Sequence, residues 1–236
     1  MLKLSNVTKR FGALIAVNDL SLEVEKGKIY GIAGPNGAGK STIYNLISGF
    51  YNYEGKIEFN GKSISNLHPY QIVKRGISRT FQIPQTFPSL SVEDSIDIGN
   101  RFGNTRRYRR KKVDEIINFV GLHNERKHKT GTLDLLGKKK LMIGAALATG
   151  PKLFMLDEPM AGSNAHEIKD LMKLIQKINI ELGITIIIIE HFMKVLTELT
   201  ETLLIIETGS EICCGNPSEV TSNPEVIECY LGTDHD

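Results

Sequence analysis

The sequence is poor in three features that mark other classes of protein. It has only three cysteines among 236 residues, and Cys213 and Cys214 are adjacent, so we expect no disulfide framework and a reducing, cytosolic setting. Its longest purely aliphatic run, residues 186–189, is far shorter than the roughly 18 apolar residues of a membrane-spanning helix. The opening MLKLSNVTKR has no apolar core, so we expect no secretion signal.

An excess of charge of one sign is also missing. Lys and Arg number 29 against 27 Asp and Glu, and the net charge of +2 is too small to favour nucleic acid as a partner. The longest basic run is at 106–112, RRYRRKK, which we interpret as a solvated face or as a contact with acidic lipid headgroups or a transporter loop. With 41% hydrophobic and 24% charged residues, the chain has the composition of an ordinary globular protein with a substantial core.

Strand and helix patterns indicate the fold class. Residues 20–24 alternate apolar and polar side chains, and residues 56–64 flank Asn60-Gly61, a strong hairpin signal. Later, strand patterns at 152–157 and 184–190 enclose a helical pattern that Gly183 ends. These patterns predict an α/β core with a parallel sheet and an N-terminal antiparallel β subdomain.

The middle of the chain has a different pattern. Residues 92–100 and 111–122 repeat apolar side chains at helical intervals. We therefore expect an inserted α-helical subdomain at about 86–150, within a single domain that spans residues 1–236.

A glycine-rich segment follows the strand pattern of residues 28–33 and fits G-x-x-x-x-G-K-[ST]. Its glycines let the backbone turn tightly and aim N–H groups at phosphate oxygens, and a helix that begins near Lys40 adds its positive end. Lys40 would bridge the terminal phosphates of a nucleotide, and the Ser41 hydroxyl would bind Mg²⁺. The strand before it and the apolar helix after it argue against a chance turn. The predicted phosphate-binding residues are Gly34, Pro35, Asn36, Gly37, Ala38, Gly39, Lys40, Ser41 and Thr42.

An acidic pair ends a second buried strand pattern, LFMLDE at residues 153–158. Asp157 can hold Mg²⁺, directly or through water. Glu158 can orient and deprotonate an attacking water. Alone, such a pair could be a solvated turn, but beside a phosphate loop it predicts hydrolysis of a bound phosphate ester.

These motifs resemble those of the ATP-binding cassette (ABC) subunits of membrane transporters, over nearly the whole chain. The resemblance implies that the nucleotide is ATP and that the core is that of a P-loop NTPase, and it gives roles to three further residues. Phe11 stands where that family places an aromatic side chain that stacks on adenine. Gln82, in RTFQ, matches the glutamine that senses the γ-phosphate, and we add it to Ser41 and Asp157 as a Mg²⁺ ligand. His191 matches the switch histidine, so the implied catalytic residues are Glu158, His191 and Gln82.

A narrower resemblance is to the ATP-binding subunits of branched-chain amino acid importers. It rests on residues 76–96, on MLDEPMAGSN at 155–164 and on the tail NPEVIECYLG at 223–232. The urea/amide branch of that group and lipopolysaccharide-export ATPases share much of this, and RTFQ favours the importers. The resemblance implies a peripheral subunit at the cytoplasmic face of the cell membrane. Its partners would be permease subunits and, through them, a substrate-binding protein.

One segment departs from the family. There, two cassettes dimerise head to tail, and each ATP lies between one phosphate loop and the other subunit's signature, usually L-S-G-G-Q. Here the aligned residues 133–137 read LDLLG, so a carboxylate at Asp134 and a side chain at Leu136 stand where a γ-phosphate should approach. The lysines at 138–140 could restore some attraction, and an alignment shifted by one residue would match Gly137 to a signature glycine.

The altered signature favours a heterodimer with a second, different ABC ATPase subunit over a homodimer. It also keeps two alternatives open. One is a soluble cassette ATPase that works on no membrane protein, and the other is a regulatory cassette with low turnover.

Overall fold

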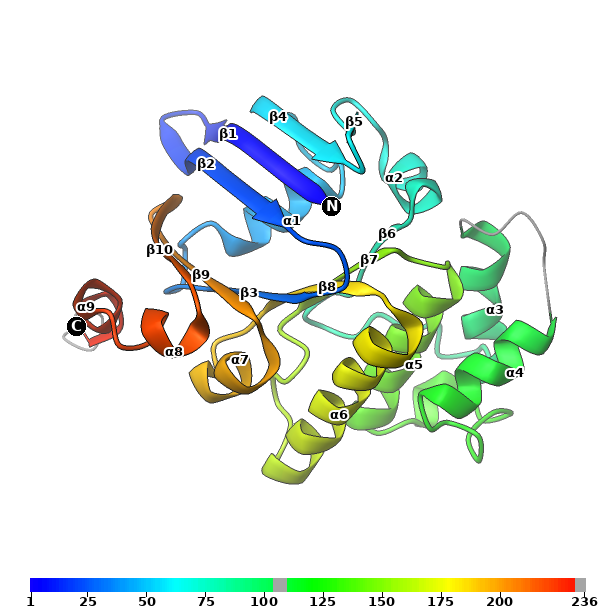
Figure 1. Ribbon diagram of the computed structural model, residues 1–236. Coiled ribbons are helices and arrows are strands. Elements are labelled where there is room, and N and C mark those ends of the chain that lie inside the picture. The colour runs from blue at the N-terminus through cyan, green and yellow to red at the C-terminus, as the bar shows by residue number, and fades with distance from the viewer. Residues whose placement is uncertain (104–109, 232–236) are drawn as a thin grey trace. The chain divides into compact units, whose positions relative to one another are not determined.

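The computed structural model describes residues 1–103 and 110–231, so most of the basic run at 106–112 lies outside the described residues. The chain forms two compact units (Figure 1). The first unit combines residues 1–69 with the chain from 185 onward, and the second holds residues 70–184. The fold is α/β, with an antiparallel β subdomain at the N-terminus and helices in the middle of the chain, as the sequence predicts.

The first unit begins with an antiparallel sheet of order β2-β1-β4-β5. Leu20, Leu22 and Val24 are buried on one face of it, as their alternation predicts. The predicted hairpin turn forms at Asn60 and Gly61, whose φ angles of 51° and 72° are both positive. The strands are β1 (Leu2–Phe11), β2 (Leu14–Val24), β4 (Glu54–Phe59) and β5 (Lys62–Ser63).

The same unit contains a second, largely parallel set of strands. β3 pairs in parallel with β8 on one side and β9 on the other, and β10 closes an antiparallel hairpin with β9. Figure 1 shows α1 between this set and the N-terminal sheet, and the Tyr44 hydroxyl of α1 donates to the carbonyl of Ile187 at 2.7 Å. The strands are β3 (Ile29–Ala33), β8 (Thr185–Ile189), β9 (Thr202–Glu207) and β10 (Ser210–Gly215). The helices are α1 (Lys40–Ile47), α7 (Met193–Leu199), α8 (Pro217–Val220) and α9 (Pro224–Leu231).

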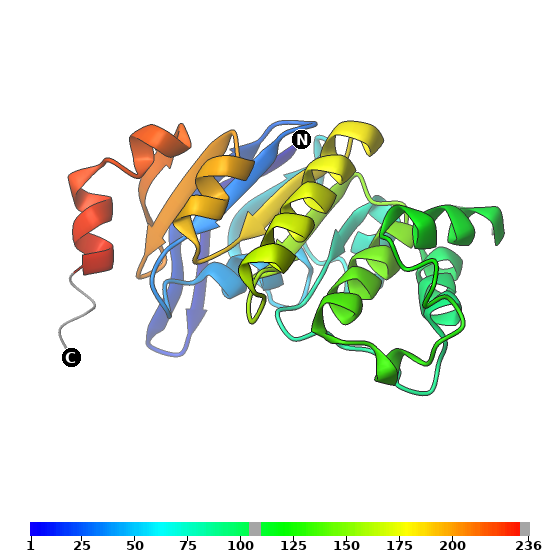
Figure 2. The same cartoon turned by 90° about the horizontal axis from the view of Figure 1, so that it is seen from below.

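The second unit pairs two parallel strands and packs helices α3, α4 and α5 against one another (Figure 2). Polar side chains start three helices of this unit: Ser91 caps α3, Asp134 caps α5, and Asn164 forms a capping box on α6. Gly183, with φ of 63°, ends α6 as predicted. The elements are α2 (Pro69–Arg75), β6 (Ile77–Arg79), α3 (Val92–Phe102), α4 (Arg110–Phe119), η1 (Thr130–Thr132), α5 (Leu135–Ala148), β7 (Leu153–Asp157) and α6 (Ala165–Leu182).

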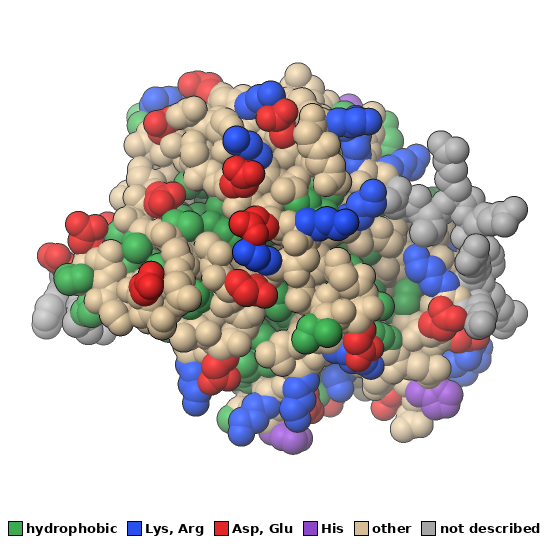
Figure 3. All heavy atoms as spheres, viewed as in Figure 1, with side chains coloured by type: hydrophobic (Ala, Val, Ile, Leu, Met, Phe, Trp, Pro, Cys, Tyr) green, Lys and Arg blue, Asp and Glu red, His purple; other side chains and the backbone are tan. Residues whose placement is uncertain are grey.

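Within the described ranges, none of the helices is both long and apolar enough to cross a membrane. Acidic and basic side chains are interspersed over the described part of the face in Figure 3. This mixture agrees with the small net charge of the sequence.

Candidate functional site

The glycine-rich segment forms the loop between β3 and α1, and α1 begins at Lys40 as predicted. Both ends of the loop lie against other backbone. A Cβ atom at Gly34 would stand 2.0 Å from the Ile206 carbonyl oxygen, and one at Gly39 would stand 2.3 Å from that of Ala16. Both glycines also have positive φ angles, so other residues would clash and strain the backbone there.

Lys40 is the buried cation of this loop. Only 6% of the residue is exposed, and its ammonium donates to the carbonyl oxygens of Gly34 at 2.6 Å and Pro35 at 2.8 Å. Ser41 follows it in the first turn of α1 and is exposed. An anionic phosphate is a stronger partner for an ammonium than a neutral carbonyl, because the hydrogen bond is then charged on both sides. The loop can therefore exchange its own carbonyls for phosphate oxygens.

Two other segments of the first unit support the loop. The Gly209 amide, in the turn between β9 and β10, donates to the Ala38 carbonyl at 2.9 Å. His191 is exposed and follows β8, whose Ile189 pairs with Ile32 of β3. Because β3 and β8 are parallel, the phosphate loop and His191 leave the sheet at the same carboxyl edge.

Phe11 ends β1 and is 41% exposed. Its ring packs edge-to-face on Tyr51, with centroids 5.2 Å apart and an interplanar angle of 84°. The Lys9 ammonium lies 4.8 Å from the Phe11 centroid. An exposed aromatic ring of this kind can stack on a nucleobase. No sequence pattern points to Tyr51, which reaches Phe11 because β1 pairs with β4.

Asp157 ends β7 in the second unit and forms a buried ion pair. Its carboxylate accepts a hydrogen bond from Arg79 Nη2 at 2.7 Å, and the two side chains are only 6% and 9% exposed. Arg79 is the last residue of β6, which runs parallel to β7 with Arg79 opposite Met155. Sequence reasoning assigned no role to Arg79, since the pair depends on β6 and β7 being neighbours.

Glu158 follows at once, and its conformation is unusual. Its φ angle of 46° lies in the left-handed region, which a residue with a Cβ atom rarely adopts and which is often found at functional sites. The amide Nε2 of Gln82 donates to its carboxylate at 2.5 Å. The structure thus brings together two of the predicted catalytic residues.

The residues predicted for Mg²⁺ offer a hydroxyl from Ser41, an amide from Gln82 and a carboxylate from Asp157. Oxygen donors of this kind are those that Mg²⁺ prefers, with one or two carboxylates and phosphate or water completing the shell. The cationic Arg79 beside Asp157 shows that this carboxylate already accepts a positive partner. The chemistry of the set therefore fits Mg²⁺.

The altered signature forms the start of α5. Asp134 is its N-cap residue, and its Oδ1 accepts from the Gly137 amide at 2.7 Å. A hollow of about 360 Å³ is lined in part by Asp134, Leu136 and Gly137. A carboxylate of the chain itself therefore occupies the N-terminal turn of this helix, where it stabilises the helix dipole and an otherwise unsatisfied amide.

In the lysine run at 138–140, which follows the altered signature, Lys139 is directed into the protein. Lys139 is 2% exposed, and its ammonium donates to the Ala161 carbonyl at 2.5 Å and the Ser163 hydroxyl at 2.7 Å. The expectation that the run at 138–140 attracts phosphate is therefore wrong for Lys139, because its ammonium is directed into the loop at 161–164.

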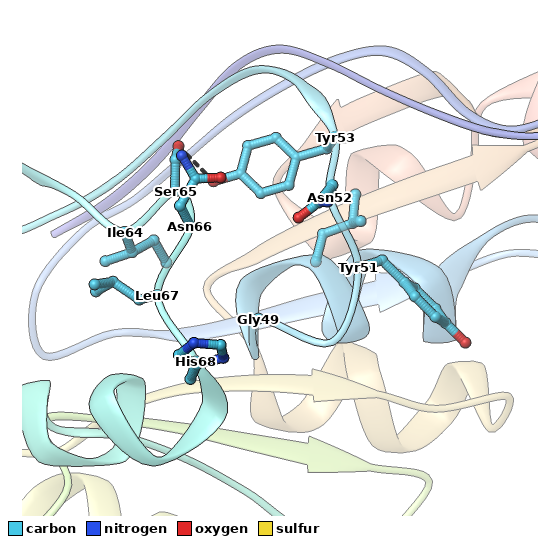
Figure 4. Close-up of a pocket in the computed structure, with 10 residues that line it drawn as sticks. Gly49, Tyr51, Asn52, Tyr53, Ile64, Ser65, Asn66, Leu67 and His68 are labelled. Carbon is cyan, nitrogen blue, oxygen red and sulfur yellow. Dashed lines mark hydrogen bonds between the residues drawn. The ribbon is translucent and has the colours of Figure 1, made fainter.

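A separate hollow of about 190 Å³ lies in the first unit, between the end of α1 and the segment after β5 (Figure 4). The Tyr53 hydroxyl and the Ser65 hydroxyl are 2.9 Å apart at its wall. None of the predicted site residues lines this hollow.

Comparison with known families agrees with this geometry. A family described as ABC transporter matches residues 17–161. A second, described as branched-chain amino acid ATP-binding cassette transporter, matches residues 211–236.

Known proteins and structures resemble the whole chain. The high-affinity branched-chain amino acid transport ATP-binding protein BraF of Pseudomonas aeruginosa is 34% identical, over 98% of each chain. LivG of Escherichia coli, named in the same way, is 30% identical over the same shares. Among solved structures, the ADP conformation of MJ1267, an ATP-binding cassette of an ABC transporter, is 32% identical over 98% of each chain, with a TM-score of 0.89. A nucleotide-free ATP-binding cassette from an ABC transporter gives a TM-score of 0.88 at 31% identity, covering 97% of this chain and 98% of that one.

Proposed function

The chain belongs to the ABC transporter family, and we propose that it is the ATP-hydrolysing motor subunit of an importer for branched-chain amino acids or a related amino acid or amide. It is an ABC ATPase subunit homologous to the ATP-binding proteins of branched-chain amino acid transport systems. The observation that carries the proposal is the phosphate loop, with Lys40 buried at the start of α1.

In this proposal the nucleotide is held by residues of the first unit. Phe11 stacks on adenine, which its exposed ring permits. Lys40 leaves the carbonyls of Gly34 and Pro35 for the terminal phosphates, and the loop amides and the α1 N-terminus complete the anion site. The phosphate contacts come from residues Gly34, Pro35, Asn36, Gly37, Ala38, Gly39, Lys40, Ser41 and Thr42.

Hydrolysis would depend on the acidic pair and its neighbours. Glu158 takes a proton from the attacking water, and Gln82 holds its carboxylate in place through their hydrogen bond. Gln82 would also sense the γ-phosphate, and His191 would act as the switch histidine from the carboxyl edge of β8. Ser41, Gln82 and Asp157 would hold Mg²⁺, which when bound neutralises charge on the phosphates.

We further propose that this chain pairs with a second, different ABC ATPase subunit. The pair would sit at the cytoplasmic face of the membrane, beneath permease subunits that receive substrate from a binding protein. The carboxylate of Asp134 at the α5 N-terminus supports a heterodimer. A homodimer would set that carboxylate against phosphate in both sites, whereas a partner cassette with an unaltered signature would complete the site on this chain.

The alternative of a soluble or regulatory cassette with low turnover draws support only from the same Asp134. The whole-chain similarity to transport ATP-binding proteins favours the motor subunit.

A calorimetric titration of the purified chain with Mg-ATP tests the proposed function directly. We expect saturable binding that requires Lys40. Supply of permease subunits and a second cassette should then raise phosphate release above that of the chain alone, and a complex that never exceeds the isolated chain would favour the regulatory alternative.

A further inference from the structure

Lys139 links two segments of the second unit that are far apart in sequence. It lies one turn into α5, and its ammonium donates to the Ala161 carbonyl and the Ser163 hydroxyl, which belong to the loop between β7 and α6. A buried ammonium is costly unless hydrogen bonds replace its water shell. These two bonds to residues 161–164, which we call the post-acidic loop, therefore tie the loop and the helix together strongly.

A second contact joins the same two segments. A Cβ atom on Gly162 would stand 3.3 Å from Cδ2 of Leu135, so the backbone of the post-acidic loop lies directly against the first residue of α5. Gly162 also has a positive φ of 72°, which suits glycine. The loop and the first turn of α5 thus meet through one polar and one apolar contact.

The post-acidic loop is in turn joined to the acidic pair. The Ala161 amide donates to the Glu158 carbonyl at 3.2 Å, and the Ser163 amide donates to the Met160 carbonyl at 3.0 Å. Because of these turns, a displacement of Glu158 is expected to displace the Ala161 carbonyl and the Ser163 hydroxyl as well. At the other end, Lys139 lies five residues after Asp134, within the same helical segment as the altered signature.

We propose that Lys139 is a positioning residue for ATP hydrolysis, which couples the turn after Glu158 to the signature segment 133–137 of the same subunit. This inference rests on the proposed function, since it needs ATP to act on Asp157 and Glu158. In a paired assembly, the acidic pair serves this chain's own nucleotide and the signature segment faces the partner's nucleotide. Lys139 would therefore transmit the state of one nucleotide site to the other.

The physical reason lies in the acceptors. When the nucleotide moves Glu158, the short turns move Ala161 and Ser163, and the buried ammonium must follow or lose both bonds. A broken bond would remove part of the hydrogen bonding of a buried charge, which costs more than a small shift of α5.

Hydrogen exchange measured by mass spectrometry on the full chain, with and without Mg²⁺ and a non-hydrolysable ATP analogue, tests the coupling. In the wild type, the analogue should slow amide exchange both at residues 158–164 and at residues 133–139. In Lys139→Met, which keeps the chain length but not the donors, the change at 158–164 should persist and that at 133–139 should shrink at least about fivefold, the lower end of typical coupling factors. Affinity for the analogue should stay within about twofold, because the phosphate contacts come from other residues.

Lys173→Met is the matched control, since it removes the same charge from an exposed position on α6 and should behave as wild type. Lys139→Arg keeps donors and should restore part of the response. If Lys139→Met does not fold, Ser163→Ala removes one acceptor and should reduce the response at 133–139 in part.

An undiminished response at 133–139 in Lys139→Met, or in Ser163→Ala should only that variant fold, would overturn the inference. The inference would also be overturned if α5 of Lys139→Met exchanged faster than in the wild type by the same factor with and without the analogue. That result would mark a merely structural role for Lys139. A wild-type chain that binds no Mg-ATP by calorimetry would refute the proposed function itself, and the inference with it.

Discussion

Gln82 donates a hydrogen bond of 2.5 Å to the carboxylate of Glu158, across 76 positions of sequence. Glu158 itself holds a left-handed φ of 46°. A strained backbone fixes the direction of its side chain, and the amide fixes the carboxylate oxygen. The group proposed as general base is thus held before any water molecule is activated.

Replacement of Lys40 by Ala should weaken binding of Mg-ATP about tenfold or more, because charge-assisted hydrogen bonds to phosphate are the strong ones. Isothermal titration calorimetry on the isolated chain measures this. Lys62→Ala, on the exposed strand β5, is the control and should bind as wild type. Equal affinity of the Lys40 variant and the wild type would show that the loop does not hold the phosphates.

Glu158→Gln should keep ATP binding and lower turnover about 100-fold or more, because an amide cannot accept the proton of water. The amide oxygen can still accept from Gln82, so the local geometry should survive. Phosphate release by the assembled transporter is the measurement, with exposed Glu54→Gln as the control. Wild-type turnover of the Glu158 variant would assign the base to another residue.

Arg79→Met should destabilise the chain by about 3–5 kcal/mol, the usual result of removing one partner of a buried ion pair. Both side chains of the Arg79–Asp157 pair are at most 9% exposed, so the remaining carboxylate would gain little from water. Adding Asp157→Asn to the variant should recover much of the loss. The free energy of unfolding of both variants is measured by urea denaturation. If Arg79→Met lowers it by less than about 1 kcal/mol, the ion pair contributes little to stability.

Acid should weaken the second unit through Glu93. Hydrogen bonds from Arg126 and Lys127 lower the pKa of Glu93 from its ordinary 4.5 to about 2, against the smaller opposing effect of burial. Because the folded-state pKa is the lower one, the stability from this group is fully present above about pH 4.5 and is lost as the pH falls towards about 2.

Glu93→Gln should therefore flatten the acid limb of the unfolding free energy between about pH 4.5 and 2. The pH dependence of urea unfolding measures it, with Glu54→Gln as the comparison. An acid limb with the same slope in the Glu93 variant and the wild type would remove this ion pair as its cause.

The altered signature should keep the isolated chain monomeric and slow, even with ATP. In a Glu158→Gln background, Asp134→Ser with Leu136→Gly should raise ATP-driven dimerisation, seen by size-exclusion chromatography. The change removes bulk and a like charge, which at about 4 Å costs about 1 kcal/mol in bulk water and more in a drier site. Serine is also a good N-cap, so α5 should remain.

The wild-type chain, measured in the same way, can contradict this prediction. If it forms a tight dimer with ATP and hydrolyses it briskly alone, the asymmetric pairing is wrong.

Local sequence signals determined much of the fold. The positive φ angles at Asn60, Gly61 and Gly183 need only neighbouring residues, so the turn and the helix end could be predicted. On α6, Leu171, Leu174, Ile175 and Ile178 recur at helical intervals and are buried. Ile168 and Met172 fall at similar intervals but are only partly buried. A helical pattern predicts approximately which face of a helix is buried. Which residues at the border of that face are buried depends on the elements that pack against it.

The sequence by itself also determined the phosphate loop, since its glycines, lysine and following helix are contiguous. It marked Asp157, Glu158 and Gln82 as separate motifs. Only the tertiary structure decided that Arg79 meets Asp157, that Gln82 meets Glu158, and that Lys139 turns inward to Ser163. Each of these contacts joins residues that strand order and helix packing bring together, and no local periodicity encodes such distant partners.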